Sequence, residues 1–201
     1  MPDTWYPPAH AAPGPEWKTG GGGEILRPSS HGAVVHSAEG SLEGALAVLH
    51  GDREASWHFT VAKGGRVYQH YPLDAWTWHA GPLNADHAGI ECEGVAGEAL
   101  TDPQLAALVG LLQWIAHQES WPGYVRGQTL REHNEVMATA CPSGRIVWDI
   151  VIALCLGAPK PSAETQLRAL VAAAFVLSIG HPLSDLSQED RDAVRYVASQ
   201  L

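Results

Sequence analysis

Positive charge is scarce in this chain of 201 residues, which holds 12 lysines and arginines against 22 aspartates and glutamates. The formal net charge is −10. Residues 160–201 contribute little to it, because their four basic residues nearly balance their five acidic ones. The field of the remaining chain repels phosphate backbones and anionic lipid headgroups. We therefore expect no nucleic-acid partner and no binding to a membrane surface.

A long hydrophobic run is also missing. The longest apolar stretch, residues 169–179, has eleven residues, whereas roughly 20 are needed to span a bilayer. The first five residues have neither the basic start nor the apolar centre of a secretory signal peptide. We expect no membrane insertion, and synthesis in a cytoplasm without a signal peptide.

Cysteine is rare as well, and the three residues Cys92, Cys141 and Cys155 cannot all pair. A disulfide between Cys92 and Cys155 stays open, but no spacing requires it, so free buried thiols are the expected state. Apolar residues make up 45% of the chain and charged residues 17%. These are the proportions of a globular protein with one substantial core.

Proline and glycine are concentrated near the N-terminus, where residues 1–31 hold six prolines and a run of four glycines. Such a composition buries too little apolar surface to form a helix or strand. It predicts an irregular arm that packs on the domain through Trp5, Tyr6 and Trp17. Binding of sugar rings by these aromatic side chains is the alternative. A glycine- and proline-containing stretch at 157–162 predicts a linker. The expected parts are an arm over 1–31, a central domain over 32–157, and a linker with a C-terminal helical hairpin over 158–201.

Strand and helix patterns alternate through the central domain. The apolar periodicity predicts a strand ending at His36, a helix capped by Ser41, and a helix opened by a Thr101–Gln104 capping box. The remaining elements are expected as a hairpin over 57–62 and 66–70, strands over 88–93 and 127–133, and a helix over 145–156. This alternation indicates an α/β fold, with a mixed central β-sheet flanked by helices. Beyond the linker, apolar stripes predict one helix over 167–178 and another starting at Ser187 and Asp190.

The stretch 130–144 holds the residues best suited to chemistry. His133 and Cys141 lie eight residues apart (141 − 133) in a segment without clear periodicity, so they converge only if the loop folds back on itself. Imidazole and thiolate are preferred zinc ligands, and three of them leave the open position of a catalytic site. His36, at the end of a β-branched run, is the best third ligand. An ordinary strand-end histidine and a buried thiol are the alternatives.

A series of short motifs occurs in order between residues 33 and 152. It comprises Val34-Val35-His36-Ser37, Trp57-His58-Phe59, Trp78-His79-Ala80-Gly81, Asn84, Gly89-Ile90-Glu91, Glu132-His133 and Thr139-Ala140-Cys141-Pro142. The series resembles the zinc-dependent N-acetylmuramoyl-L-alanine amidases, whose fold is shared by phage lysis amidases and peptidoglycan recognition proteins. The resemblance makes residues 32–157 a zinc amidase domain.

The resemblance implies that Zn²⁺, held by His36, His133 and Cys141, activates water against the amide joining N-acetylmuramic acid to L-alanine. Glu91 resembles the general base of the wall-recycling members. Glu93 lies on the same strand face and is the rival. His79 resembles a histidine near the metal that hydrogen-bonds the oxyanion, and a plain loop histidine is the alternative.

The substrate-binding residues implied by the resemblance are Trp57, Trp78, Asn84 and Thr139. Trp57 stands where lysis amidases often have a catalytic tyrosine, and Thr139 where some have a lysine, which moves the acid–base burden onto Glu91. Either tryptophan could stack on sugar, but packing in the core is the commoner fate. Ser143 also interrupts the usual Cys-Pro-Gly turn.

The expected function is thus a peptidoglycan amidase, and the missing signal peptide favours a phage lysis enzyme that is made in the host cytoplasm and acts on the wall after release. A cytoplasmic amidase recycling muropeptides and a wall-binding module without catalysis are the alternatives. All three ligands are present, which favours the enzyme. The C-terminal helices are expected to dock on the amidase domain, pair in a homodimer, or bind the wall.

Overall fold

The computed structural model describes residues 4–20, 26–157 and 182–198, together with positions 165, 167, 170–172 and 174. The chain divides into two units, residues 1–146 and 147–201. This division falls before the last helix of the expected central domain, not at residue 157. The three-part division into arm, amidase domain and hairpin stays a prediction.

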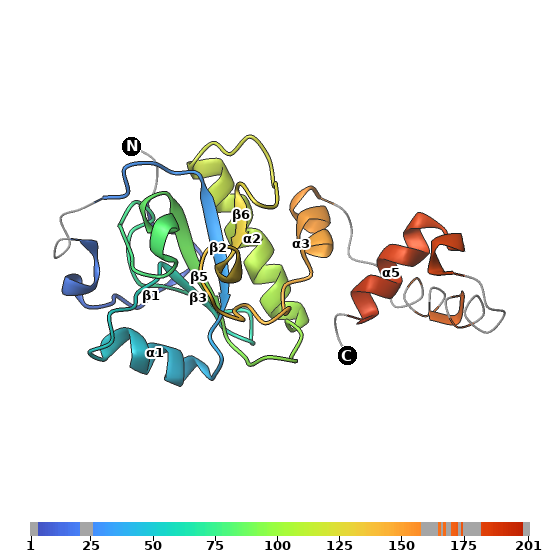
Figure 1. The fold of residues 1–201 in the computed structure, drawn as a ribbon, viewed down its shortest axis with the longest axis horizontal. Coiled ribbons are helices and arrows are strands. Elements are labelled where there is room, and N and C mark those ends of the chain that lie inside the picture. Colours follow the sequence, from blue (N-terminus) through green and yellow to red (C-terminus); the bar gives the residue numbers. More distant parts are fainter. Residues whose placement is uncertain are drawn as a thin grey trace. The chain divides into compact units, whose positions relative to one another are not determined.

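A mixed sheet forms the first unit, and its described residues supply six strands in the order β1-β4-β3-β5-β2-β6 (Figure 1). Only β3 and β4 pair antiparallel, and the other neighbours are parallel. The strands are β1 (His10–Ala11), β2 (Gly32–Ser37), β3 (Phe59–Val61), β4 (Val67–Gln69), β5 (His87–Cys92) and β6 (Leu130–Glu132). The predicted α/β class with a mixed central sheet is confirmed.

The apolar run before His36 forms the centre of this sheet. Ala33, Val34 and Val35 of β2 are fully buried between β5 and β6, as expected of a parallel strand covered on both faces. The predicted hairpin is present as β3 and β4. Its turn places Gly65 at φ +82°, where an added Cβ would also meet the backbone of Pro103 at 2.8 Å.

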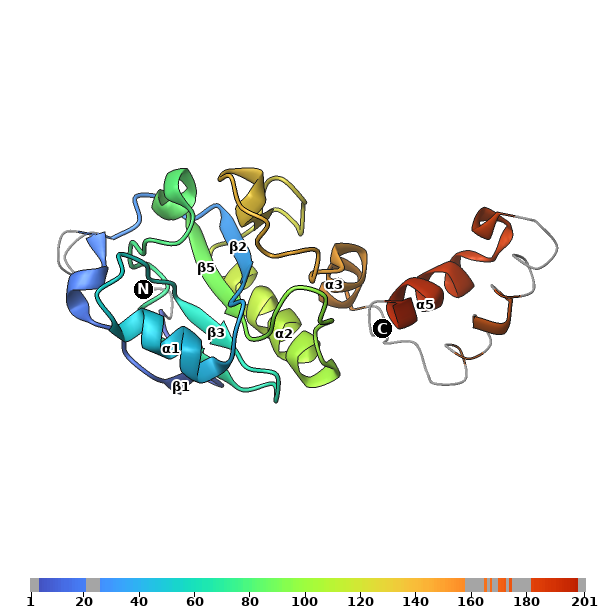
Figure 2. The ribbon, with the colours of Figure 1, turned by 60° about the horizontal axis from the view of Figure 1, so that its bottom comes forward.

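Helices cover both faces of the sheet (Figures 1 and 2). Helix α1 (Leu42–His50) begins at the predicted cap Ser41, whose side chain accepts from Gly44 N–H. Its buried Ala45 and Leu49 share a core cluster with Trp57, Tyr71 and Ala75. Gly44, Ala45 and Val48 of this helix line a cleft together with His36.

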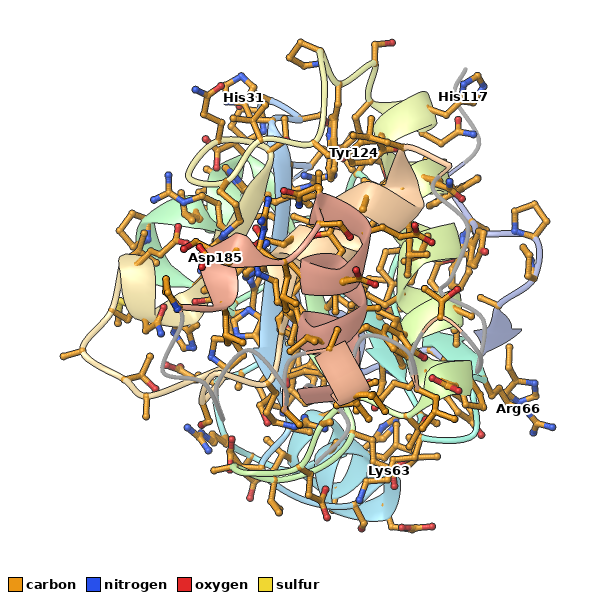
Figure 3. All side chains as sticks on the ribbon, turned by 90° about the vertical axis from the view of Figure 1, so that its right-hand side faces the viewer. His31, Lys63, Arg66, His117, Tyr124 and Asp185 are labelled. Atoms are coloured by element: carbon orange, nitrogen blue, oxygen red, sulfur yellow. The ribbon has the colours of Figure 1, made fainter. Side chains whose placement is uncertain are left out.

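Helix α2 (Asp102–Gln118) covers the other face, where Trp114 packs against Phe59 with ring centroids 6.2 Å apart. Figure 3 places His117, in its last turn, at the same end as His31, which precedes β2, and Lys63 at the opposite end. Helix α2 therefore runs antiparallel to β2. The predicted capping box is only half right, because Thr101 caps the helix while Gln104 Nε2 donates to the carbonyls of Val61 and Glu93.

The N-terminal arm is more ordered than its composition predicts. Residues His10 and Ala11 pair with β4, and the ladder continues as Ala12 N–H donates to Gln69 O at 2.9 Å. The expectation of an arm without strands is wrong, because the edge of β4 offers unpaired backbone groups that any extended segment can use. Tyr6 packs on Trp114 with ring centroids 5.2 Å apart, whereas Trp5 and Trp17 are 37% and 48% exposed.

The second unit contains α3 (Trp148–Cys155) and α5 (Gln188–Ala198). Helix α3 begins three residues later than predicted, because Arg145 is held by carbonyl groups of the first unit (see below). Ser187 caps α5 as predicted, accepting from Asp190 N–H at 3.1 Å. The helix predicted over 167–178 lies largely outside the described residues. None of the three cysteines forms a disulfide, so the disulfide alternative is wrong. In the described part of the chain, every helix is too short or too polar to cross a bilayer.

Candidate metal centre and cleft

Three side chains from distant parts of the chain meet at one end of the sheet. One ligand atom each from His36, His133 and Cys141 lies within 4.8 Å of the other two. Cys141 Sγ is 3.8 Å from His36 Nδ1, and the two imidazole centroids are 4.7 Å apart. Two imidazoles and a thiol at this spacing are a donor set that zinc prefers, and their open side faces a cleft. The residues present therefore fit a zinc ion.

The strand register explains how His133 reaches His36. In the parallel pair of β2 and β6, Val35 is opposite Glu132, so the residues that follow each lie side by side. The chain then folds back, and Asn134 N–H donates to Cys141 O at 3.0 Å. Ser143 takes a left-handed conformation at φ +60°, and its hydroxyl donates to Glu39. These contacts close the loop that brings the thiol to the imidazoles.

Glu91 adjoins the three ligands, and Glu93 does not. Glu91 is the register partner of His36 and lines the cleft. Its Oε2 is buried without a hydrogen-bond partner among the described residues. Burial, reinforced by Glu39, raises the pKa of the Glu91 carboxyl to about 8. Glu93 instead accepts the backbone N–H groups of Leu42 and Lys63. It therefore links the first residue of α1 to the turn between β3 and β4.

His79 lies against His36, and both of its ring nitrogens are engaged. Its Nδ1 is 3.1 Å from His36 Nε2, and its Nε2 is 3.1 Å from the carbonyl oxygen of His87. Burial lowers the pKa of His79 to about 3, and that of His36 well below its ordinary value. Both rings are therefore neutral imidazoles.

The cleft over the three ligands has a volume of about 500 Å³. All four residues expected to bind substrate line it, but they differ in exposure. Trp78 is half-buried and Thr139 exposed, whereas Trp57 is only 4% exposed. Asn84 Oδ1 accepts from the N–H groups of His79 and Ala80, at 3.0 and 2.7 Å. Trp78 and Thr139 are the members of this set most accessible to a ligand.

A family model described as N-acetylmuramoyl-L-alanine amidase matches residues 27–144, which are more than half of the chain. The match includes every residue of the candidate site named so far in this subsection. This chain belongs to that family. Two curated amidases of Bacillus subtilis (strain 168) are similar to it. XlyA is 31% identical over 120 residues, which cover 54% of this chain and 35% of XlyA. CwlH is 36% identical over 77 residues, which cover 32% of this chain and 30% of CwlH.

This chain thus spans about a third of the length of the curated relatives that it matches. A similar solved structure is the endolysin N-acetylmuramoyl-L-alanine amidase LysCS from Clostridium intestinale URNW. It superposes with a TM-score of 0.58 at 20% identity, covering 78% of this chain and 99% of that one. At this identity the likeness shows a shared fold.

The sequence-based prediction for this chain missed Arg145, which binds Ser37, a residue that lines the cleft. Its guanidinium donates to Ser37 Oγ at 3.0 Å and to the carbonyls of Cys92, Glu93 and Glu98 at 3.1, 2.8 and 2.9 Å. Gly94 leaves room for it, since an added Cβ would lie 2.2 Å from Nη2. No spacing in the sequence indicates this role, because the four acceptors belong to tertiary neighbours.

A second missed feature is the hydrogen-bond chain that fixes Trp57 in the wall of the cleft. His70 Nδ1–H donates to the carbonyl of Ala12 at 2.8 Å, so its Nε2 accepts from the Thr60 hydroxyl at 2.9 Å. Thr60 Oγ1 in turn accepts from Trp57 Nε1–H at 2.8 Å. A series of hydrogen bonds through His70 and Thr60 therefore connects the N-terminal arm to Trp57 in the wall of the cleft.

This chain of bonds requires a neutral His70, and we expect a pH dependence from it. Burial lowers the pKa of His70 to about 4 from 6.5, with His50 adding to the effect. Because the unfolded chain protonates first, the contribution is complete above pH 6.5 and is lost as pH falls toward 4. The loss is about 3 kcal/mol. We expect the free energy of unfolding of the metal-free wild type, measured in urea, to fall between pH 7 and pH 4 by about 3 kcal/mol more than that of His70→Gln. Equal losses would contradict the assignment.

Proposed function

We propose that this chain is a zinc-dependent amidase that hydrolyses the bond between N-acetylmuramic acid and L-alanine in peptidoglycan. The observation that carries the proposal is the meeting of His36, His133 and Cys141 within 4.8 Å, on the floor of an open cleft. Membership of the amidase family supports it. When bound, zinc supplies the Lewis acidity that lowers the pKa of a coordinated water and polarises a carbonyl.

Glu91 is the proposed general base. It shares a strand register with His36, so its carboxylate lies beside the ligands, and its unpartnered oxygen is free to accept a proton from water. In the metal-free chain burial raises the pKa of this carboxyl to about 8. A bound cation beside it would favour the ionised form, which can take a proton from water and later return it to the leaving amine. None of the described residues that line the cleft is a tyrosine. Trp57, which the resemblance places where a catalytic tyrosine often stands, has its N–H bound to Thr60.

Trp78 and Thr139 are proposed to contact substrate at the walls of the cleft, and Trp57 and Asn84 to shape those walls. A half-buried tryptophan beside a polar floor can stack on a sugar ring while the peptide runs across the opening. Thr139 also accepts from Cys141 N–H at 3.2 Å. This hydrogen bond connects Thr139, at the rim of the cleft, to the backbone of the residue that carries the thiol.

The proposed biological role is lysis of a bacterial wall after release from the cell in which the protein is made. The names of the similar proteins support wall hydrolysis, since LysCS is described as an endolysin. Turbidity loss of intact walls separates this role from recycling, in which only soluble muropeptides would be cut. The homodimer through the C-terminal helices stays a prediction that sedimentation equilibrium measures.

Metal removal tests the proposed chemistry. Purified walls incubated with the zinc-loaded protein should release L-alanine amino termini. Treatment with a chelator should reduce that release to background, and one equivalent of zinc should restore it. Restoration is expected because His36, His133 and Cys141 are brought together by strand register and loop closure. A zinc-loaded protein that sediments with walls and liberates no amino termini would show a binding module instead.

A further inference from the structure

The hydrogen bonds of His79 determine which nitrogen of His36 carries a proton. The carbonyl of His87 can only accept, so His79 Nε2, 3.1 Å away, must be the protonated nitrogen. In a neutral imidazole the other nitrogen is then an acceptor. His79 Nδ1 therefore accepts from His36 Nε2–H across 3.1 Å. This leaves His36 Nδ1 without a proton, 3.8 Å from Cys141 Sγ.

We propose that His79 is a positioning residue, which fixes the ring and tautomer of His36 so that Nδ1 is the atom offered to the metal. The inference rests on the proposed zinc function. A histidine ligand whose second nitrogen is held in this way has a defined orientation and greater basicity. His79 acts through His36 and has no ring N–H left for an oxyanion. This assigns it a different part from the one that the sequence resemblance implies.

Two other residues, Gly89 and Asn84, fix the position of the His79 ring. Gly89 lies beneath it on β5, and an added Cβ would come within 2.7 Å of His79 Cγ. Asn84 Oδ1 holds the backbone on either side of the ring, accepting from His79 N–H and Ala80 N–H. The ring is thus fixed by its floor, by its backbone and by two hydrogen bonds. Asn84 is accordingly a support of the ring position.

Nitrogen NMR of the metal-free protein, labelled with ¹⁵N-histidine, tests the arrangement without reference to activity. We expect wild-type His36 to be protonated at Nε2 and unprotonated at Nδ1. In His79→Ala the acceptor is gone, so His36 should become a mixture of both tautomers. Wild-type His36 protonated at Nδ1 would overturn the inference, whether or not zinc binds.

Zinc affinity, measured by competition with a chelating dye, gives the second readout. His79→Ala should bind zinc about 10- to 100-fold more weakly than wild type. His79→Gln, whose amide oxygen can accept from His36, should recover part of the loss. Gly89→Ala keeps the histidine but displaces its ring, and should also weaken binding. His117→Gln removes a histidine from the last turn of α2, on the other face of the sheet, and should bind as wild type does.

The outcomes separate the two proposals. A wild type that binds zinc, together with a folded His79→Ala that binds it equally tightly, overturns the positioning role and leaves the proposed function intact. A wild type that binds no zinc overturns both. If His79→Ala does not fold, His79→Gln and Gly89→Ala decide, because wild-type affinity in both would contradict the role.

Discussion

Replacing Cys141 with serine is expected to remove zinc binding and to lower the rate of wall hydrolysis by ~10³-fold or more, which corresponds to about 4 kcal/mol of activation free energy. A serine hydroxyl is a poor zinc ligand, whereas a thiolate is among the preferred ones. The fold should persist. Among the described residues the sulfur, which is half-buried, hydrogen-bonds with the backbone of Ser37 and with His36 Nδ1. The loop is also closed by the bond from Asn134 N–H to the carbonyl of Cys141, which does not use the sulfur.

Zinc content, the hydrolysis rate and the melting temperature of the metal-free protein check this prediction together. Cys155→Ser is the matched control, because Cys155 is a buried thiol in the second unit and its replacement should leave zinc content and rate unchanged. If Cys141→Ser unfolds the chain, the metal is structural and the catalytic account is wrong.

Replacing Glu91 with glutamine is expected to lower kcat by about 10²- to 10⁴-fold, the usual contribution of a general base, while zinc remains bound. The amide matches the carboxylate in shape but cannot take up a proton. Single-turnover rates and zinc content on the same preparations measure the effect. A Glu91→Gln variant with wild-type kcat would assign the base to another group.

The same substitution should make the metal-free protein more stable at neutral pH. The folded pKa of Glu91, about 8, lies above its ordinary value of 4.5. Between these values the unfolded chain gives up the proton that the folded chain keeps, so stability falls as pH rises from 4.5 to 8. Glutamine removes that loss. Glu93→Gln should act in the opposite direction, because that carboxylate accepts two backbone N–H groups. A destabilised Glu91→Gln would show a structural role.

The elements that follow from local pattern are the ones that the sequence predicts well. The cap at Ser41, the β-branched run ending at His36 and the glycine turn at Gly65 each depend on neighbours within a few residues. The β1 strand could not be predicted, because its stability comes from the edge of β4, more than fifty residues away. The start of α3 was misplaced for the same reason, since Arg145 is held by tertiary acceptors.

The candidate site was predictable in its residue types and not in its supporting bonds. Histidine and cysteine are residue types that zinc prefers, and the order of the motifs resembles that of a known family. The resemblance favoured Glu91 over Glu93, which lies on the same strand face. The structure supports that choice, because Glu91 lines the cleft whereas Glu93 accepts two backbone N–H groups. The part played by His79 depends on the carbonyl of His87, to which no motif points.

X-ray absorption at the zinc edge of the purified protein tests the shared metal site most directly. We expect one zinc per chain, with two imidazole nitrogens, one sulfur and a light fourth ligand in its first coordination shell. A protein that holds no zinc, or a zinc shell without sulfur, would contradict the convergence of His36, His133 and Cys141 on a single cation.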